Sequence, residues 1–303
     1  MERKIIYIIN PISGTGGRRN LHKIVERRSN EAGISFQLFP SVESGDYGFL
    51  KKIIEEEQIT DIVIAGGDGT VSQVVGSLHK TGVNFGIIPC GSGNGLALAA
   101  GISKKPERAL DIIFAGHSEP TDGFVLNGQF ACMLSGLGFD AKVAHDFAKQ
   151  PKRGLSTYIK QVFRNFLRAK TYRFRITSEK KQLDIEAYFI SIANANQFGN
   201  HFTIAPKASL SDGLLDIVIM ASPHKLAVLW QTMQQVGGFT PLKDPSQINP
   251  KKGVIYFQTE KISIENFSQA PLHIDGDPAE TPDTIEVKVR KQVFKLLKPV
   301  KSI

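Results

Sequence analysis

Three glycine-rich segments contain the residue types that could do chemistry in this chain. The segment VIAGGDGTVSQVVGSL, at 63–78, places Asp68 among Gly66, Gly67 and Gly69. Glycines let a backbone approach a ligand closely, and a helix that begins there directs free N–H groups at an anion. A carboxylate inside such a cradle repels phosphate. Asp68 is therefore expected to act through Mg²⁺ or to take a proton from an incoming hydroxyl, unless it only caps the helix.

The other two segments have the same character. The first follows KIIYIIN and offers backbone and hydroxyl donors, with two arginines as phosphate partners. Its residues are Ser13, Gly14, Thr15, Gly16, Gly17, Arg18 and Arg19. The second follows NFGIIP and has glycines at 91, 93 and 95, with Asn94 before an apolar helix. One such loop is often only a tight turn, but three at successive strand ends are much less expected by chance.

The elements around these loops determine where they lie. The first 115 residues alternate buried strand-like runs with amphipathic helical patterns, which predicts a βαβα order and a parallel sheet. After Asp68, apolar residues recur at helical spacing from Val71 to Leu78. This loop therefore joins a strand end to a helix start, which is where ligand sites of open α/β sheets lie.

The second part of the chain has a different texture. From about residue 120 the segments are strand-like, with only two convincing helical patterns, at 155–169 and 224–236. This predicts a mostly β, antiparallel or sandwich-like unit. We place the boundary between Gly116 and Gly123, where HSEPTDG supplies turn residues. The expected domains are an α/β nucleotide-binding domain at 1–120 and a β-rich domain at 121–303, whose last residues are free to pack on the first.

Composition and absent motifs narrow the function. The 303 residues are 41% hydrophobic and 22% charged, which is typical of a globular chain. No apolar run reaches the roughly 18 residues of a membrane span, and two cysteines form no disulfide framework, so a cytoplasmic location is expected. The net charge of +8 suits an anionic partner, but no nucleic-acid-binding motif is present. The missing GxxxxGK[ST], GxGxxG, HExxH and GxSxG motifs argue against P-loop enzymes, dehydrogenases, metalloproteases and serine hydrolases.

The ordered set of motifs resembles a known family. NPISGTGG, GGDGT and PCGSGNGLA are similar to the catalytic domain shared by diacylglycerol kinases, sphingosine kinases and bacterial lipid kinases. SDGLLDIVIM at 211–220 and HIDGDPAE at 273–280 resemble that family's DG-L-D and DGE segments, so the resemblance covers nearly the whole chain. GGDGT alone is also found in NAD kinases and resembles a phosphofructokinase loop.

This resemblance implies ATP-dependent phosphorylation of a lipid hydroxyl, diacylglycerol-like or sphingoid-like, in phospholipid metabolism. It implies an NAD kinase-like or phosphofructokinase-like α/β domain, with ATP and Mg²⁺ between it and the β-rich domain. By motif, Asp275 matches the general base, with Asp68 as its competitor, and Asp212 and Asp216 match a Mg²⁺ network that includes Asp68. The implied nucleotide site consists of Asn10, Ser13, Gly14, Thr15, Gly66, Gly67, Asp68, Gly69, Thr70, Gly91, Ser92, Gly93 and Asn94.

Two positions depart from the family pattern. Gly95 follows Asn94, which is closer to the sphingosine kinase form, and Asp277 replaces a glutamate with a side chain one methylene shorter. Two alternatives are therefore kept: a soluble NAD kinase-type phosphotransferase, and a nucleotide- or lipid-binding regulator without catalysis. ISIANANQFGN, at 190–200, lacks the asparagine-glutamate pair that the first alternative requires.

The acceptor lipid predicts a peripheral contact with a membrane surface. The candidate residues are Lys142, Lys149, Lys152, Arg153, Tyr158, Phe163 and Phe166. Core packing of the helix around the last three is the competing interpretation. A homodimer is left open.

Overall fold

The computed structural model describes residues 2–11, 20–150, 157, 160–162, 164–165, 168–179, 182–199, 202–221 and 253–300. Of the sequence-predicted elements, the helix at 224–236 lies outside these residues. In the helix predicted at 155–169, the described residues 157, 160–162 and 164–165 are helical.

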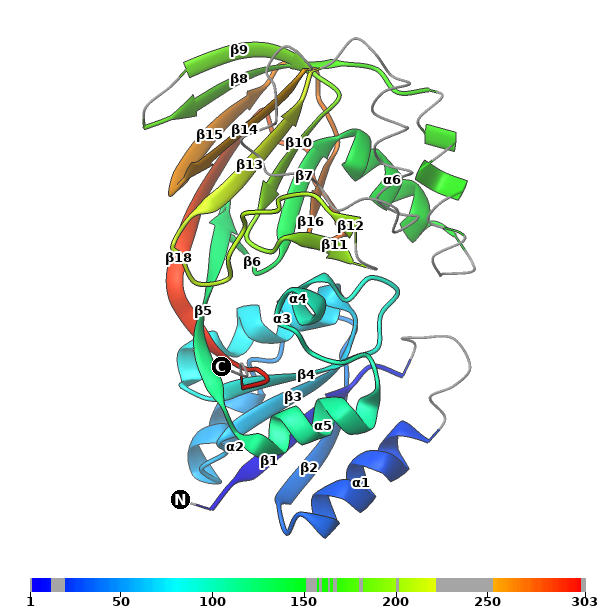
Figure 1. Ribbon diagram of the computed structural model, residues 1–303, viewed down its shortest axis with the longest axis vertical. Helices are drawn as coiled ribbons and strands as arrows, with labels where there is room; N and C mark the ends of the chain where they lie inside the picture. Colours follow the sequence, from blue (N-terminus) through cyan, green and yellow to red (C-terminus); the bar gives the residue numbers. More distant parts are fainter. Residues whose placement is uncertain are drawn as a thin grey trace.

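The N-terminal half is the predicted parallel α/β unit. Its strands lie in the order β2-β1-β3-β4, and every neighbouring pair is parallel. Helices α1 and α5 lie on one face of this sheet, and α2 and α3 lie on the other (Figure 1). The elements are β1 (Lys4–Ile9), α1 (Leu21–Glu31), β2 (Ser35–Pro40), α2 (Leu50–Glu56), β3 (Asp61–Gly66), α3 (Asp68–Leu78), the 3₁₀ helix η1 (His79–Thr81), β4 (Asn84–Pro89), α4 (Gly95–Ala99) and α5 (Pro106–Ala115).

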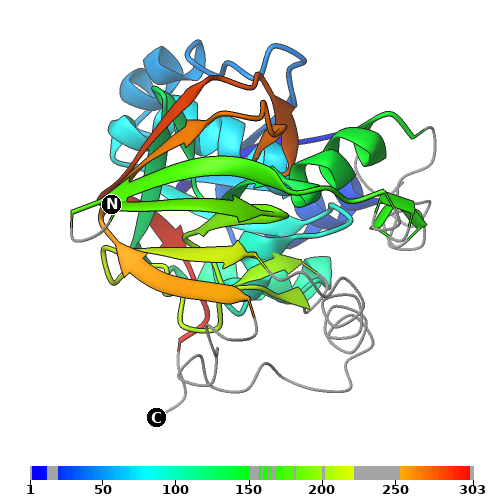
Figure 2. The same ribbon diagram turned by 90° about the horizontal axis from the view of Figure 1, so that it is seen from above.

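The C-terminal half is a sandwich of two sheets. Strand β13 pairs antiparallel with β14 on one side and with β10 on the other, and β7, β16 and β17 continue the sheet beyond β10. Apolar residues of both sheets, including Phe174, Ile217 and Ile264, meet in one buried cluster. Figure 2 shows these strands from above. The elements are β5 (Ser118–Leu126), β6 (Gln129–Ala131), β7 (Leu134–Gly138), α6 (Phe139–Ala148), β8 (Tyr172–Ser178), β9 (Gln182–Ala187), β10 (Phe189–Ala193), β11 (Gln197–Gly199), β12 (Phe202–Thr203), β13 (Leu215–Met220), β14 (Val254–Thr259), β15 (Lys261–Asn266), β16 (Leu272–Ile274), β17 (Asp277–Ala279) and β18 (Thr284–Leu297).

Strand β18 joins the two halves. Its first part pairs with β15 in the sandwich, whereas Lys295 and Leu296 pair parallel with Asn84 and Phe85 of β4. Strand β5 runs antiparallel beside β18, with a register shift between Arg290 and Phe294. Figure 1 shows β18 passing from the upper half to the lower half, where the chain ends. The two units are therefore fixed to each other through a continuous mixed sheet.

Two details of the sequence prediction were wrong. Residues 118–123, expected as turn residues, belong to β5, and Thr121 and Asp122 are fully buried, because pairing with β18 overrides the local turn preference. Helix α6 was not predicted. Only Ala141 and Val143 of this helix are buried, so its apolar pattern is weak.

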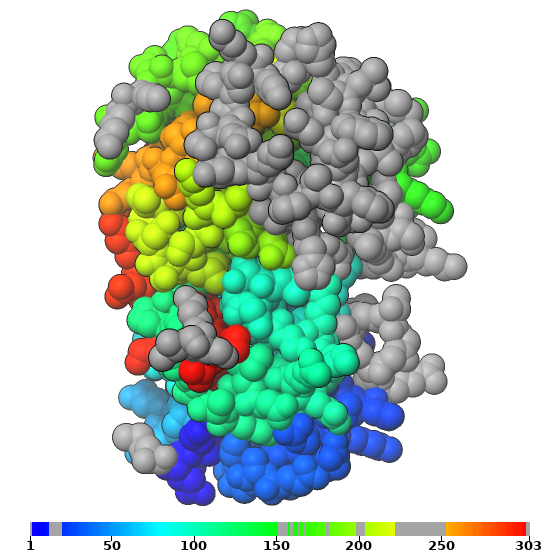
Figure 3. All heavy atoms as spheres, in the orientation of Figure 1, coloured from blue at the N-terminus to red at the C-terminus, as the bar shows by residue number. Residues whose placement is uncertain are grey.

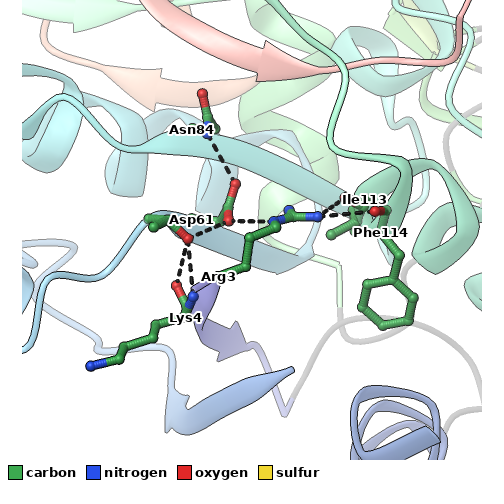
Figure 4. Close-up of polar contacts among 7 residues, drawn as sticks. Arg3, Lys4, Asp61, Asn84, Ile113 and Phe114 are labelled. Carbon is green, nitrogen blue, oxygen red and sulfur yellow. Dashed lines mark hydrogen bonds and ion pairs between the residues drawn. The ribbon is translucent and has the colours of Figure 1, made fainter. Parts of the chain in front are cut away.

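The amino ends of β1, β3 and β4 are held by a buried polar cluster (Figure 4). Asp61 accepts hydrogen bonds from Arg3 Nε at 3.0 Å and from Asn84 Nδ2 at 3.1 Å. Arg3 Nη1 also donates to the carbonyls of Ile113 and Phe114, at the end of α5. The Asp61 carboxylate is 1% exposed, so loss of Arg3 would leave a buried charge without its cation, at the edge of the sheet opposite the glycine loops.

No helix of the described residues has both the length and the apolar character needed to cross a membrane.

Candidate active site

Asp68 lies in the first turn of α3, directly after strand β3. Gly67 occupies the N-cap in an extended conformation and forms no side-chain capping bond. Asp68 does not cap its own helix; its Oδ1 accepts the N–H of Leu96, at the start of α4, at 3.3 Å. Burial raises the pKa of Asp68 to about 6, and the charge of Asp275 adds to that rise, whereas the N–H groups of Gly95 and Leu96 oppose it. The capping interpretation therefore fails for α3.

The loops after β3 and β4 touch through their backbones. A Cβ added at Gly91 would lie 2.6 Å from the Cα of Gly67, so a side chain at 91 would separate the loops. The N–H of Cys90 donates to the carbonyl of Gly66 at 2.7 Å. The strand-to-helix loops thus form one joined surface above the sheet.

The side chain of Asn94 stabilises the loop after β4. It adopts a left-handed conformation with φ of 60° and is buried. Its Oδ1 accepts the N–H of Gly91 at 2.7 Å, and its Nδ2 donates to the carbonyl of Gly91 at 2.8 Å. The side-chain amide of Asn94 is thus engaged with its own loop, while Ser92 is exposed.

Asn10 connects the end of β1 to the same surface. Its Nδ2 donates to Thr70 Oγ1 at 2.9 Å, which fixes Thr70 in the first turn of α3. Ser13, Gly14 and Thr15, expected to line the nucleotide site, lie outside the described residues.

Asp275 reaches this region from the other unit. Asp275 and Gly276 have φ of 48° and 87°, and Ile274 pairs with Asp277, so the pair forms the two-residue turn of the β16–β17 hairpin. Asp-Gly is a favoured sequence for such a turn, because both positions require positive φ.

The carboxylate of Asp275 sits in a cradle of amides. Its Oδ1 accepts the N–H groups of Met133 and Leu134 at 3.0 and 2.9 Å, and its Oδ2 accepts that of Cys132 at 2.9 Å. Burial raises the pKa of Asp275, while the hydroxyl of Ser72 and these amides oppose that rise. The side chain is 3% exposed, so it is fixed and shielded from solvent.

The hairpin also brings Asp277 to the N-terminus of α3. A Cβ added at Gly69 would lie 2.5 Å from Asp277 Oδ2, so this carboxylate lies directly over Gly69. The buried thiol of Cys132 interacts electrostatically with both Asp275 and Asp68. Burial and the charges of these two carboxylates raise the pKa of the thiol well above its usual value. The candidate site therefore lies where the hairpin of the sandwich meets α3 of the α/β unit.

The loops and the sandwich are in contact around this junction. In the space-filling view, the cyan residues around α4 meet the yellow-green residues of the segment before β13 (Figure 3). Asp122 anchors that segment. Its Oδ2 accepts the N–H of Gly213 at 2.7 Å, and its Oδ1 accepts that of Gln292 at 2.6 Å.

Asp212 and Asp216 form a separate acidic group. Asp216 is buried and accepts hydrogen bonds from the Tyr256 hydroxyl and from Gln258 Nε2. Its pKa is raised by burial, with a contribution from the charge of Asp212. Burial raises the pKa of Asp212, and the charge of Asp122 adds to that rise.

The Mg²⁺ network of Asp68, Asp212 and Asp216 stays a prediction. Asp68 faces α4 and Asp275, whereas the other two face Asp122 and Tyr256. Among the described residues, no group of three or more His, Cys, Asp or Glu side chains could hold a metal ion.

The sequence did not point to several residues that the site contains. Ser72 lies one helical turn after Asp68, at a spacing that could have indicated it. Cys132 and Asp122 gave no local signal, because their hydrogen-bond partners are distant in the sequence. Cys132 binds Asp275, 143 residues later, and Asp122 binds Gly213, 91 residues later, and Gln292, 170 residues later.

Two family models match the two units of the chain. The model of the diacylglycerol kinase catalytic domain matches residues 4–125, and that of the YegS C-terminal NAD kinase beta sandwich-like domain matches residues 134–297. A diacylglycerol kinase of Staphylococcus carnosus is 24% identical over 91% of this chain and 89% of its own. A protein of Chromohalobacter salexigens named probable lipid kinase YegS-like is 26% identical over 83% of this chain and 80% of its own.

A solved structure shares the fold. The crystal structure of a diacylglycerol kinase from Bacillus anthracis superimposes with a TM-score of 0.72 at 19% identity, covering 98% of this chain and 97% of that chain. The two family models divide the chain between the α/β unit and the sandwich, whose hairpin and helix α3 form the site. The chain therefore belongs to the diacylglycerol kinase and YegS-like lipid kinase family, a family of phosphotransferases.

Proposed function

We propose that this protein transfers the γ-phosphoryl group of ATP, with Mg²⁺, to the hydroxyl of a diacylglycerol-like or sphingoid-like lipid. The observation that carries the proposal is the meeting of the β16–β17 hairpin with the N-terminus of α3. It brings two carboxylates of the sandwich, Asp275 and Asp277, to the Asp68 loop of the α/β unit.

The α/β unit supplies features that suit the phosphates of a nucleotide. The first turn of α3 has no side-chain cap, and a helix N-terminus favours negative charge. The contact between Gly67 and Gly91 leaves the two loop backbones without intervening side chains. Binding of the phosphates here would place the γ-phosphoryl group near the hairpin.

Asp68 suits the role of proton acceptor better than Asp275. A carboxylate offers about four acceptor sites, and those of Asp275 are engaged by three backbone N–H groups and the Ser72 hydroxyl. Asp68 is partly exposed, and its pKa of about 6 lies close to neutral pH, where a general base works best. We assign Asp68 to accept the proton of the lipid hydroxyl and Asp275 to fix the geometry and charge around it.

The donor set also fits Mg²⁺ held together with a nucleotide. Mg²⁺ is usually bound by one or two carboxylates plus substrate phosphates, instead of by a cage made only of protein. Asp277, placed over the first turn of α3, is a carboxylate of this kind, and its shorter side chain still reaches that turn. Bound there, Mg²⁺ would neutralise charge on the phosphate oxygens.

The lipid acceptor requires a contact with a membrane surface. A cavity of about 360 Å³ lies beside α6 and is lined by five cationic side chains, with Asp146 and Tyr172 among its other residues. The cations are Lys142, Lys149, Arg164, Arg168 and Lys170. Lys152, Arg153, Tyr158, Phe163 and Phe166, also expected at this surface, lie outside the described residues.

The membrane contact is tested by sedimentation with vesicles. Binding to phosphatidylcholine vesicles that contain phosphatidylglycerol should exceed binding to phosphatidylcholine alone. The Lys142→Ala, Lys149→Ala double variant should weaken it, since each basic residue near an anionic surface contributes about 1 kcal/mol. Equal sedimentation with both vesicle types would remove the proposed contact.

The phosphoryl transfer is tested with labelled γ-phosphate. Wild type and Asp68→Asn would be incubated with Mg-ATP and a micellar panel of diacylglycerol, monoacylglycerol, sphingoid bases and ceramide, with NAD as a control acceptor. Asp111→Asn, which removes an exposed carboxylate paired with Arg28 far from the site, is the matched control. Label should enter a lipid with wild type and Asp111→Asn only. Label in NAD alone would support a soluble phosphotransferase instead.

A further inference from the structure

A buried histidine contacts the hairpin that carries Asp275. His273 on β16 is 2% exposed, and its Nδ1 accepts the N–H of Gly276 at 3.2 Å. Its Nε2 lies 3.5 Å from Asp140 Oδ2, at the start of α6. An Nδ1 that accepts a hydrogen bond carries no proton, so the neutral ring has its proton on Nε2, toward Asp140. The ring thus links α6 to the second residue of the turn.

The neighbouring strand leaves room for this pair. Gly136 on β7 is the cross-strand partner of His273, and a Cβ at this position would overlap Asp140 Oδ2 and lie 2.8 Å from His273 Nε2. Asp140 Oδ1 accepts the N–H of Ala141, whereas Oδ2 is buried and receives no hydrogen bond from the described residues. The proton on His273 Nε2 is therefore well placed to face this oxygen.

Helix α6 and its N-cap residue Gly138 also contact the segment that leads to the turn. His145 Nε2 lies 2.7 Å from the carbonyl of Leu272, and the N–H of Gly138 donates to the carbonyl of Pro271 at 2.9 Å. The position of β16 against α6 is therefore fixed, and His273 extends that support to Gly276.

We propose that Asp140 and His273 are positioning residues for the lipid kinase reaction. Through the N–H of Gly276 they hold the turn in which Asp275 has a left-handed conformation. The held turn keeps Asp275 in its amide cradle and Asp277 over Gly69. This inference rests on the proposed function, because it assigns these two residues a purpose in that reaction.

Two substitutions separate the two ends of the ring. In His273→Asn the side-chain oxygen lies near the place of Nδ1 and can still accept from Gly276, but the side chain cannot reach Asp140. In His273→Gln the amide reaches the place of Nε2 and can donate to Asp140, but Gly276 loses its acceptor. His22→Gln, at an exposed histidine on α1, is the matched control.

The experiment measures hydrogen exchange of the segment 272–279 in the full chain, together with kcat and the KM for Mg-ATP. His273→Gln should exchange about tenfold faster and lower kcat about tenfold with little change in KM, because small displacements of reacting groups are costly. His273→Asn should recover most of both losses, and Asp140→Asn should give a smaller change in the same direction.

Two results would overturn the inference. One is unchanged exchange of 272–279 in both His273→Gln and Asp140→Asn. The other is an equal loss of kcat in His273→Asn and His273→Gln, which would mean that the ring only fills space. If wild type labels no lipid, the proposed function fails, but the exchange measurement still decides whether His273 and Asp140 hold the turn.

Discussion

Replacing Asp68 with asparagine is expected to stabilise the protein at neutral pH while it abolishes phosphoryl transfer. Burial raises the pKa of Asp68 from its ordinary 3.8 to about 6, so the folded protein binds this proton more tightly than the unfolded chain does. The stabilising contribution of the proton is complete below about pH 4 and is lost as the pH rises through about 6. At pH 7 the folded state therefore contains an ionised carboxylate in an unfavourable place.

The size of the effect follows from the shift. A difference of roughly two pKa units corresponds to about 3 kcal/mol, at about 1.36 kcal/mol per unit. Asp68 is partly exposed, so solvent screening makes this figure an upper limit, and we expect a gain of about 1–3 kcal/mol at pH 7. Asparagine keeps an oxygen that can accept the N–H of Leu96, so the substitution removes the charge without removing that hydrogen bond.

The measurement is urea unfolding of wild type and Asp68→Asn at several values between pH 4 and pH 7, with the lipid kinase assay alongside. The variant should be the more stable protein at pH 7, and the difference should shrink toward pH 4. Asp111→Asn serves as the control for removing a carboxylate at an exposed site. A constant difference across this range, or a less stable variant at pH 7, would refute the burial argument. Retained activity in Asp68→Asn would refute its assignment as proton acceptor.

Three further predictions concern the same junction. Asp275→Asn should lower kcat at least about a hundredfold. Unlike Asp68→Asn, it should also destabilise the fold by about 1–3 kcal/mol in urea unfolding, because an amide cannot accept from all three backbone N–H groups of Cys132, Met133 and Leu134. Gly69→Ala should lower kcat about tenfold, because the added methyl group displaces the Asp277 carboxylate. The free energy of unfolding should change by less than about 1 kcal/mol, because only the end of one exposed side chain has to move. The pH profile of kcat/KM should fall on its acid side with a midpoint near 6 and a slope of one proton, since Asp68 must be ionised to accept a proton; a profile flat down to pH 5 would contradict this.

The sequence predicted those parts of the fold that local patterns determine. Helical spacing after Asp68 correctly indicated a strand-to-helix loop, and the alternation of strands and helices indicated the parallel sheet. The first part of β5, residues 118–123, was predicted as a turn because its strand structure depends on β18, which begins at Thr284. Pairings between such distant segments leave no signature in local composition.

The same limit applies to the site. The motifs identified Asp68 and Asp275, but the amide cradle of Asp275 comes from residues 132–134, more than 140 positions earlier. The sequence also did not show that Asp216 accepts hydrogen bonds from Tyr256 and Gln258, which lie on the adjacent strand β14. Residue types and spacing indicated which carboxylates matter, whereas tertiary contacts decide which of them meet.

Asp68 and Asp275 cannot substitute for each other at the junction, because their carboxylates differ in hydrogen-bond partners and in exposure. Asp275 accepts three backbone N–H groups at 2.9 to 3.0 Å, whereas Asp68 accepts that of Leu96 at 3.3 Å and lies within the field of Asp275. When two carboxylates interact, the proton goes first to the one whose charge is less well stabilised. Burial raises the pKa of both carboxylates, and Asp68 is the more exposed of the two. The charge of Asp275 helps to raise the pKa of Asp68. The two substitutions differ because asparagine at 275 leaves backbone N–H groups of the cradle without an acceptor, whereas asparagine at 68 keeps an acceptor for Leu96.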